Sequence, residues 1–117
     1  MGVMASLADR RVGVLPLPRQ VNWRGRSGRF YALMAERFET FSLDTDKLYM
    51  LARGPIPMWV GTAHDVIHDA PSRSRFRLAL EASDRAFTVD AGEDDLSRMT
   101  IVWDLEGAEP VTGLSAA

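Results

Sequence analysis

The sequence predicts a small α/β sandwich of the α+β type, in which a mainly antiparallel sheet of three or four strands is covered by two or three helices. Three observations favour this class. Two apolar segments flank the turn-forming sequence RGPIP, as in a β-hairpin. The segment after Pro71 repeats its apolar residues at helical spacing. The composition, 46% hydrophobic and 26% charged, is that of an ordinary globular domain.

A chain of 117 residues has room for one domain, because a second core would leave each too small to be stable. We expect a single globular domain over residues 21–107. Residues 1–20 are expected to form a flexible arm, since Pro16 and Pro18 exclude a continued helix or a central strand. Residues 108–117 are small, polar and interrupted by proline, so we expect a flexible C-terminal tail.

The composition excludes several kinds of site. The chain has no cysteine, so it has no disulfide, no thiolate zinc site and no cysteine nucleophile. Its apolar runs are far shorter than the ~20 residues that span a bilayer, and no apolar stretch precedes a cleavage site near the N-terminus. We therefore expect a soluble, cytoplasmic protein without a membrane segment.

The first predicted strand covers Arg29–Met34. Its sequence RFYALM has the aromatic and apolar content of a strand, and Gly25 and Gly28 supply a turn before it. The following residues, 35–46, fit either a helical turn or an irregular loop.

An antiparallel hairpin is predicted over Lys47–Ala52 and Pro57–Thr62. Both segments are apolar, and the connection between them is short and rich in turn formers. The second strand leads into a short helix predicted over Ala63–Asp69, with Thr62 as its cap and Pro71 closing it.

A second helix is predicted over Ser72–Ser83. Its apolar stripe and arginine-rich opposite side follow from three- and four-residue spacing of Phe76, Ala79, Leu80 and Ser83. A short strand is then predicted over Arg85–Val89.

The last element, Glu93–Gly107, is expected to be a helix. Acidic residues begin it and glycine ends it. One helical face is compatible with Leu96, Met99, Val102, Trp103 and Leu105. The β-branched run Thr100–Val102 favours a strand instead.

Charge is divided along the chain. Residues 1–58 hold nine Lys and Arg against five Asp and Glu, a net +4, whereas residues 59–117 hold five against eleven, a net −6. A basic half can meet nucleic acid or an acidic partner, and an acidic half can mask it. The two halves can equally neutralise each other within the fold.

The predicted hairpin supplies three candidates for a recognition surface. Tyr49, Trp59 and Gly61 lie on neighbouring strands, and a strand glycine permits close approach of a ligand or another backbone. Tryptophan in a strand is also a common core anchor. Tyr49 fits either role.

Two arginine clusters are candidates for binding phosphate. Arginine forks suit phosphate oxygens, and aromatic faces accept unstacked bases. The first cluster lies in WRGRSGRFY beside Trp23 and comprises Arg24, Arg26 and Arg29. The second opens the second helix and comprises Arg73, Arg75 and Arg77. In the alternative interpretation these arginines pair with carboxylates of the C-terminal half, and Trp23 caps the core.

His64 and His68 are candidate metal ligands. The sequence HDVIH has the form of the zinc-peptidase helix HExxH with aspartate in place of glutamate, and histidines at i and i+4 share a helix face. The sequence has no third histidine and no cysteine, so a carboxylate would have to complete the site. A solvated helix face explains the same residues.

The segment Lys47–Pro110 resembles the GIY-YIG nuclease domain. In that family a tyrosine lies in the first strand, and a second aromatic, one residue and a glycine close the next. LYML and WVGT hold those places here, with Tyr49 and Trp59 ten residues apart. The predicted order of strand, strand, helix, helix, strand and helix agrees with the resemblance.

The catalytic positions depart from the family pattern. The family's arginine on the first helix corresponds to Asp69, and its metal-binding glutamate corresponds to Ile101, although Asp104 and Glu106 lie nearby. Loss of both groups would remove most of the power to cleave a phosphodiester. The resemblance therefore implies a degenerate module retained for binding.

We accordingly expect a non-catalytic binding or regulatory module that contacts nucleic acid or an acidic protein and needs no cofactor. The alternative is a hydrolase or nuclease that holds a divalent metal through His64 and His68 or through Glu106. A further alternative is a structural subunit of a homo- or hetero-oligomer, associating through an apolar sheet edge or the last helix.

Overall fold

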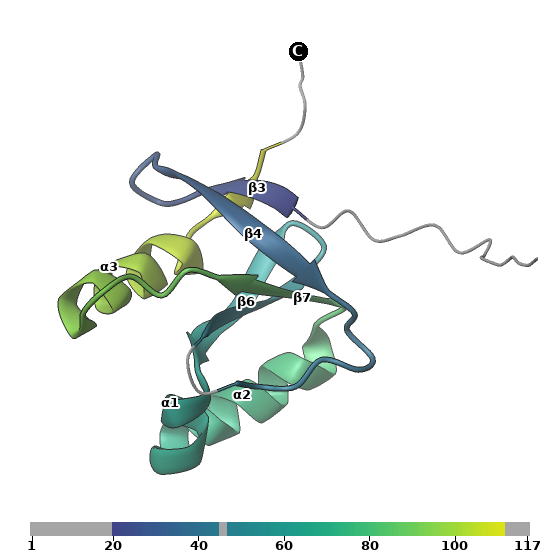
Figure 1. Cartoon of the computed structure of the whole chain (residues 1–117). Coiled ribbons are helices and arrows are strands. Elements are labelled where there is room, and N and C mark those ends of the chain that lie inside the picture. The colour runs from purple at the N-terminus through teal and green to yellow at the C-terminus, as the bar shows by residue number, and fades with distance from the viewer. Residues whose placement is uncertain (1–19, 45–46, 112–117) are drawn as a thin grey trace, which may run out of the picture.

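The computed structural model describes residues 20–44 and 47–111, which form a six-stranded antiparallel sheet and three helices (Figure 1). The strand order is β6-β5-β7-β4-β3-β8. The strands are β3 (Gln20–Arg24), β4 (Phe30–Glu36), β5 (Leu48–Arg53), β6 (Ile56–Thr62), β7 (Arg85–Val89) and β8 (Glu109–Pro110). The helices are α1 (Ala63–His68), α2 (Ala70–Ala82) and α3 (Asp95–Glu106).

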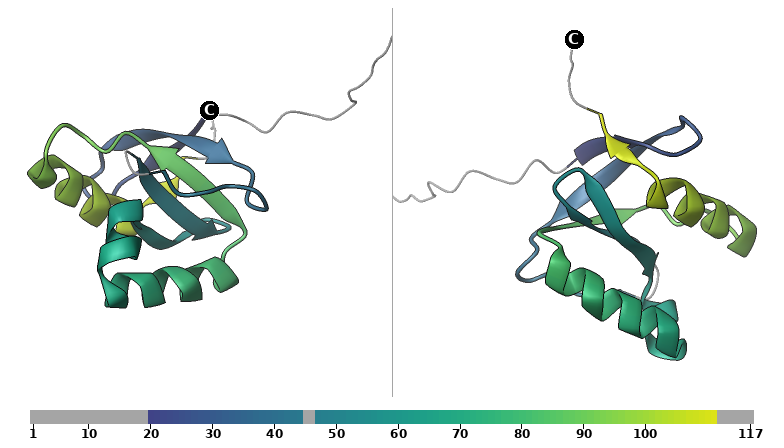
Figure 2. Two further views of the ribbon diagram at one scale, coloured as in Figure 1. Left: turned by 60° about the horizontal axis from the view of Figure 1, so that its bottom comes forward. Right: turned by 180° about the vertical axis from the view of Figure 1, so that it is seen from behind.

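The α+β class, the antiparallel sheet and the helical cover are confirmed, but the expected three or four strands are wrong. The sheet is curled, with α1 and α2 on one face and α3 on the other (Figures 1 and 2). Five of the six β5 residues are buried, because both faces of this strand are covered. The α3 face of the core includes Met50, Phe87, Ile101 and Leu105. The α2 face includes Tyr49, Leu51, Trp59 and Ala79.

β3 and β8 are the strands that the sequence analysis missed. β3 is short: its sequence QVNWR alternates polar and apolar residues over only five positions, with Trp23 buried and Val21 partly buried. Glu109 and Pro110 form β8 by pairing with β3, and Ala108 before them is buried, so these residues are part of the sheet and the core. Residues 1–19 of the expected arm and 112–117 of the expected tail lie outside the described residues.

The first two helices are capped by side chains at their N-termini. Thr62 caps α1 as predicted, because its hydroxyl accepts from the Asp65 amide at 3.1 Å and the Asp65 carboxylate accepts from the Thr62 amide at 3.2 Å. α2 begins earlier than predicted. Asp69 caps it by accepting from the Ser72 amide at 2.9 Å. Pro71 therefore lies in the first turn of α2, where a missing N–H costs nothing.

The last element is a helix, as expected, but its predicted apolar face is mostly wrong. Ile101 and Leu105 are buried, whereas Leu96, Met99 and Trp103 are 75%, 68% and 51% exposed. The buried face includes Asp104, a polar residue that the apolar pattern could not include. Within the described ranges, no helix has the length and apolar character needed to cross a membrane.

Asp104 attaches the turn between β3 and β4 to α3. Its carboxylate is 2% exposed and accepts hydrogen bonds from the Ser27 amide at 2.6 Å, the Ser27 hydroxyl at 2.7 Å and the Tyr31 hydroxyl at 2.7 Å. A side chain at Gly25 would place its Cβ 2.5 Å from this carboxylate. The turn within WRGRSGRFY thus binds α3, and Gly25 leaves room for the Asp104 carboxylate.

The same hydrogen bonds set the ionisation of both partners. Burial disfavours the Asp104 carboxylate, but the hydrogen bonds from Tyr31 and Ser27 outweigh burial and lower its pKa below 3.8. Burial, with the hydrogen bond to Asp104, raises the pKa of Tyr31 to about 12. Asp104 is therefore an ionised acceptor and Tyr31 a neutral donor at neutral pH.

We predict that Asp104→Asn lowers the free energy of unfolding at pH 7 by about 1–3 kcal/mol, because buried donors lose their charged acceptor. A carboxylate with a lowered pKa stabilises the fold above its unfolded-state pKa of about 3.9 and loses this effect as the pH falls through the folded value. The difference between variant and wild type should therefore shrink below about pH 4. Urea titrations from pH 7 to pH 2 measure it.

The matched control is Glu93→Gln, which removes one negative charge from an exposed side chain just before α3. It should leave the urea midpoint nearly unchanged at pH 7. Equal stability of Asp104→Asn and wild type at pH 7, or a difference that persists at pH 2, would contradict the assigned role of the carboxylate.

Candidate binding groove

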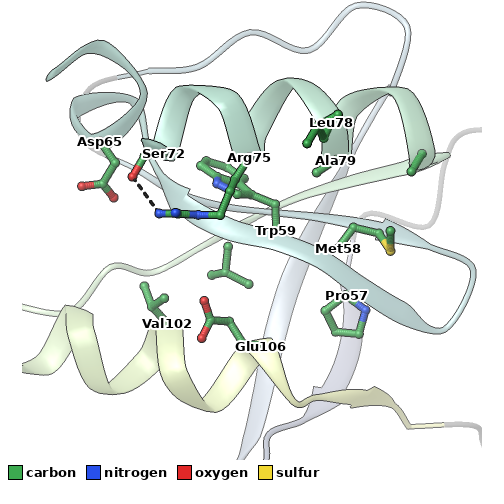
Figure 3. A pocket seen from close by; sticks show the side chains of 12 residues that line it. Pro57, Met58, Trp59, Asp65, Ser72, Arg75, Leu78, Ala79, Val102 and Glu106 are labelled. Carbon is green, nitrogen blue, oxygen red and sulfur yellow. Dashed lines mark hydrogen bonds between the residues drawn. The ribbon is translucent and has the colours of Figure 1, made fainter. Parts of the chain in front are cut away.

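A cavity of about 720 Å³ lies along β6 between α2 and α3, and we call it the β6 groove (Figure 3). Its floor is formed by four consecutive β6 residues, Pro57, Met58, Trp59 and Val60. The α2 wall consists of Ser72, Arg75, Leu78, Ala79 and Ala82. Val102 and Glu106 of α3 form the opposite wall, and Asp65 of α1 lies at one end.

The groove combines apolar walls with three charged side chains. The Asp65 carboxylate is engaged in capping α1 through the Thr62 amide. Arg75 makes one long hydrogen bond, 3.3 Å from its Nη2 to the Ser72 hydroxyl. Among the described residues, neither Arg75 nor Glu106 forms an ion pair. One cation and one anion are thus available on facing walls.

Trp59 lines the groove but is not a free stacking surface. Its side chain is 8% exposed and packs edge-on against Phe76 of α2, with 4.9 Å between ring centroids. Gly61 serves this packing, because a Cβ there would lie 2.5 Å from the Trp59 ring. The close approach expected at Gly61 is therefore made by a neighbouring tryptophan of the same strand.

Tyr49 is a core residue, so the expected exposed aromatic pair does not form. Its side chain is 2% exposed, and its hydroxyl donates to the Ser42 carbonyl at 3.0 Å and accepts from the Asp44 amide at 2.8 Å. Both hydroxyl functions are used to hold the connection before β5. Of the two roles left open for Tyr49, recognition or core, the structure gives it the core role, because β5 is buried on both faces.

The first arginine cluster is engaged with neighbours in the fold. Arg24 pairs with Glu109 across β3 and β8. Arg26 lies 4.7 Å over the Trp103 ring and donates from Nε to the Trp103 carbonyl at 3.1 Å. Arg29 lies 5.1 Å over the Tyr31 ring. Trp23 is fully buried and packs on Phe87, which agrees with the alternative interpretation that it belongs to the core.

The second cluster lies on α2, and its members differ in role. Arg73 donates from Nη1 to the Val66 and Ile67 carbonyls at 3.0 Å each, so it caps the C-terminal end of α1. Arg75 faces the groove, whereas Arg77 is exposed outside it. The turn that carries the first cluster and helix α2 lie at opposite ends of the molecule (Figures 1 and 2). The two clusters therefore do not form one basic surface.

His64 and His68 lie next to each other on α1, with 4.4 Å between ring centroids, and both are exposed. Over residues 20–44 and 47–111, no group of three or more His, Cys, Asp or Glu side chains is placed to hold a metal ion. The spacing therefore brings the two rings together as predicted, and a metal site remains a prediction without a third ligand.

The groove brings together Trp59 and Arg75, two of the predicted site residues, with Glu106, which the sequence analysis considered only as a metal ligand. Met58, Leu78 and Val102 also line the groove but were not predicted as site residues. Their side chains are ordinary apolar residues in sequence, and they line a site only because β6 is the edge strand between two helical layers. Local sequence patterns carry no signal for that position.

A scan against protein-family models and searches of curated proteins and of solved structures found no match to this chain. Kinship with the GIY-YIG nucleases therefore stays a prediction.

We predict that Gly61→Ala lowers the free energy of unfolding by about 1–3 kcal/mol, because the added methyl group overlaps the Trp59 ring and the ring cannot move without losing its contact with Phe76. Thermal or urea unfolding measures the loss. A double-mutant cycle supplies the control, since the same substitution should cost much less in a Trp59→Leu background. Equal costs in both backgrounds would contradict this packing.

Proposed function

We propose that the protein is a non-catalytic binding module that holds an extended segment of a protein partner in the β6 groove. The cavity of about 720 Å³ supports this proposal, because it lies within the ~300–1,000 Å³ typical of ligand sites. Apolar walls with a few charged groups are also typical of recognition sites, in which apolar contact supplies affinity and charge supplies orientation.

A protein segment suits the groove better than nucleic acid does. Asp65 and Glu106 place two carboxylates along it against one guanidinium, so a phosphate backbone would meet net repulsion. The other arginines of the two clusters lie on two distant elements, and Arg24 and Arg73 already bind groups of the fold. The sequence led us to expect a nucleic acid or an acidic protein as the partner. The charges in the groove favour instead a protein segment that carries both acidic and basic residues.

The residues at the family's catalytic positions support a non-catalytic role. Ile101 is buried in the core and has no chemistry to offer. Both oxygens of the Asp104 carboxylate accept hydrogen bonds from Ser27, which attach a turn. Asp69, at the place of the family's arginine, caps α2. Except for Glu106, every acidic side chain at or near these positions thus has a structural role.

We predict that Leu78→Glu weakens peptide binding at least tenfold, equivalent to about 1.4 kcal/mol, because it replaces an exposed apolar side chain on the groove wall with a charge. Peptides enriched from a phage-displayed library of random twelve-residue sequences on the wild type would be synthesised, labelled and titrated by fluorescence anisotropy. Leu96→Glu, which changes a similarly exposed leucine on α3 outside the groove, should bind them like the wild type.

Three outcomes would contradict this function. Equal losses in the two leucine variants, or no enrichment of any peptide, would leave the groove without a ligand. Binding of labelled single- or double-stranded DNA or RNA at 150 mM salt, weakening steeply as salt is added, would favour the nucleic-acid alternative instead.

A further inference from the structure

We infer that the partner binds by strand addition, as a short extended segment that pairs with the free edge of β6 and carries an acidic and a basic side chain on opposite faces. This inference rests on the proposed function, because it specifies how the same groove is filled. Three independent observations support it: the contour of the groove floor, the unpaired backbone of β6 and the opposite charges on the two walls.

The floor of the groove is a strand edge rather than a strand face. Successive side chains of a β-strand point to opposite faces of the sheet. A cavity lined by four consecutive residues, Pro57 through Val60, therefore meets both faces and the backbone between them. In Figure 3 this strand runs between α2 and α3, with side chains of both helices directed toward the space beside it.

The outward backbone groups of β6 have no protein partner in the part of the chain that the structure describes. β6 is the first strand of the sheet and pairs on one side with β5. Outside that ladder, no backbone hydrogen bond is made by residues 56–61 within the described ranges. Unpaired amides and carbonyls along a strand edge are the groups that bind an added strand.

Two features restrict where a strand can pair. Pro57 has no N–H to donate, and the β5–β6 register shifts between Leu51 and Ala52, so Met58 has no partner on β5. A proline and a bulge are common protections of a sheet edge. They leave residues 58–60, which line the groove, as the stretch able to pair with an added strand.

The charges on the walls predict the side chains of the added segment. A strand in the plane of the sheet would direct alternate side chains toward α2 and toward α3. Arg75 on the α2 wall would meet a carboxylate, and Glu106 on the α3 wall would meet an ammonium or guanidinium group. The sequence numbers of the acidic and the basic residue of the partner must therefore differ by an odd number, as in adjacent residues. Apolar residues beside them in the segment would contact Leu78 and Val102.

The probe is a blocked eight-residue peptide of alternating valine and threonine, with one aspartate and one lysine at adjacent positions. A second peptide carries the same two charges two positions apart, on one face. A third has the first sequence with N-methyl groups on alternate amides, which removes the donors but keeps every side chain. Each is titrated against the full chain by fluorescence anisotropy, and amide exchange of residues 58–60 is followed by NMR.

We expect the first peptide to bind at least tenfold more tightly than either of the others and to slow exchange of the β6 amides that do not bond to β5. Arg75→Glu should weaken it at least tenfold, and replacing the aspartate of the peptide with lysine should restore binding to that variant. Arg77→Glu is the matched control on the same helix, outside the groove, and should bind like the wild type.

The outcomes separate this inference from the proposed function. Equal affinity for the N-methylated peptide, or binding of library-selected peptides without slower exchange in β6, would overturn strand addition and leave the groove as a binding site. Failure of designed and selected peptides alike would overturn both.

Slow exchange of the β6 amides without any peptide would overturn the assignment of the edge to a partner protein. If that slow exchange grows with protein concentration in step with sedimentation, a second copy occupies the edge. If it is independent of concentration, another part of the same chain does.

Discussion

The need to cover β5 on both faces determines the architecture of this protein. Its residues Leu48 through Ala52 are all buried, so neither face of the strand can meet water. α1 and α2 cover one face and α3 covers the other. β6 is next to β5 and last in the sheet, so the two helical layers extend past it on both sides. The groove forms because helices cover both faces of β5, and β6, the next strand, is the edge of the sheet.

The polar interactions at the two ends of the molecule serve different purposes. Around Asp104, every oxygen is matched to a donor, and Gly25 gives the carboxylate the room that a side chain would take. That arrangement fixes a turn and leaves nothing for a ligand. In the groove, by contrast, Arg75 and Glu106 face each other across open space with no ion pair inside the described chain. Charged groups without an ion pair, beside backbone groups without a partner in the described chain, distinguish the groove from the contact at Asp104.

Local signals in the sequence were sufficient for the hairpin, the Thr62 cap and the stripe of α2, whereas for the last element they favoured a helix but left a strand open. They failed where distant residues decide the outcome. Trp23 lies between polar neighbours and Tyr49 between apolar ones, yet both are buried, because their exposure depends on which layers cover the sheet. Leu96, Met99 and Trp103 fit an apolar face, yet α3 turns Asp104 inward to meet Ser27 and Tyr31. The groove itself depends on β6 being an edge, and no pattern within residues 56–62 reveals that.

The place of β7 in the sheet has a consequence for synthesis on the ribosome. The hairpins β3–β4 and β5–β6 are each made of adjacent segments, but they do not touch edge to edge: β7 is inserted between them and pairs with β4 and β5. Until that strand emerges, each half has an open side and an uncovered apolar face, and pairing across such separations in sequence is slow. The nascent chain therefore carries two incomplete sheets that a late, five-residue segment joins, and this interval is when the polypeptide is most exposed to aggregation and to chaperones.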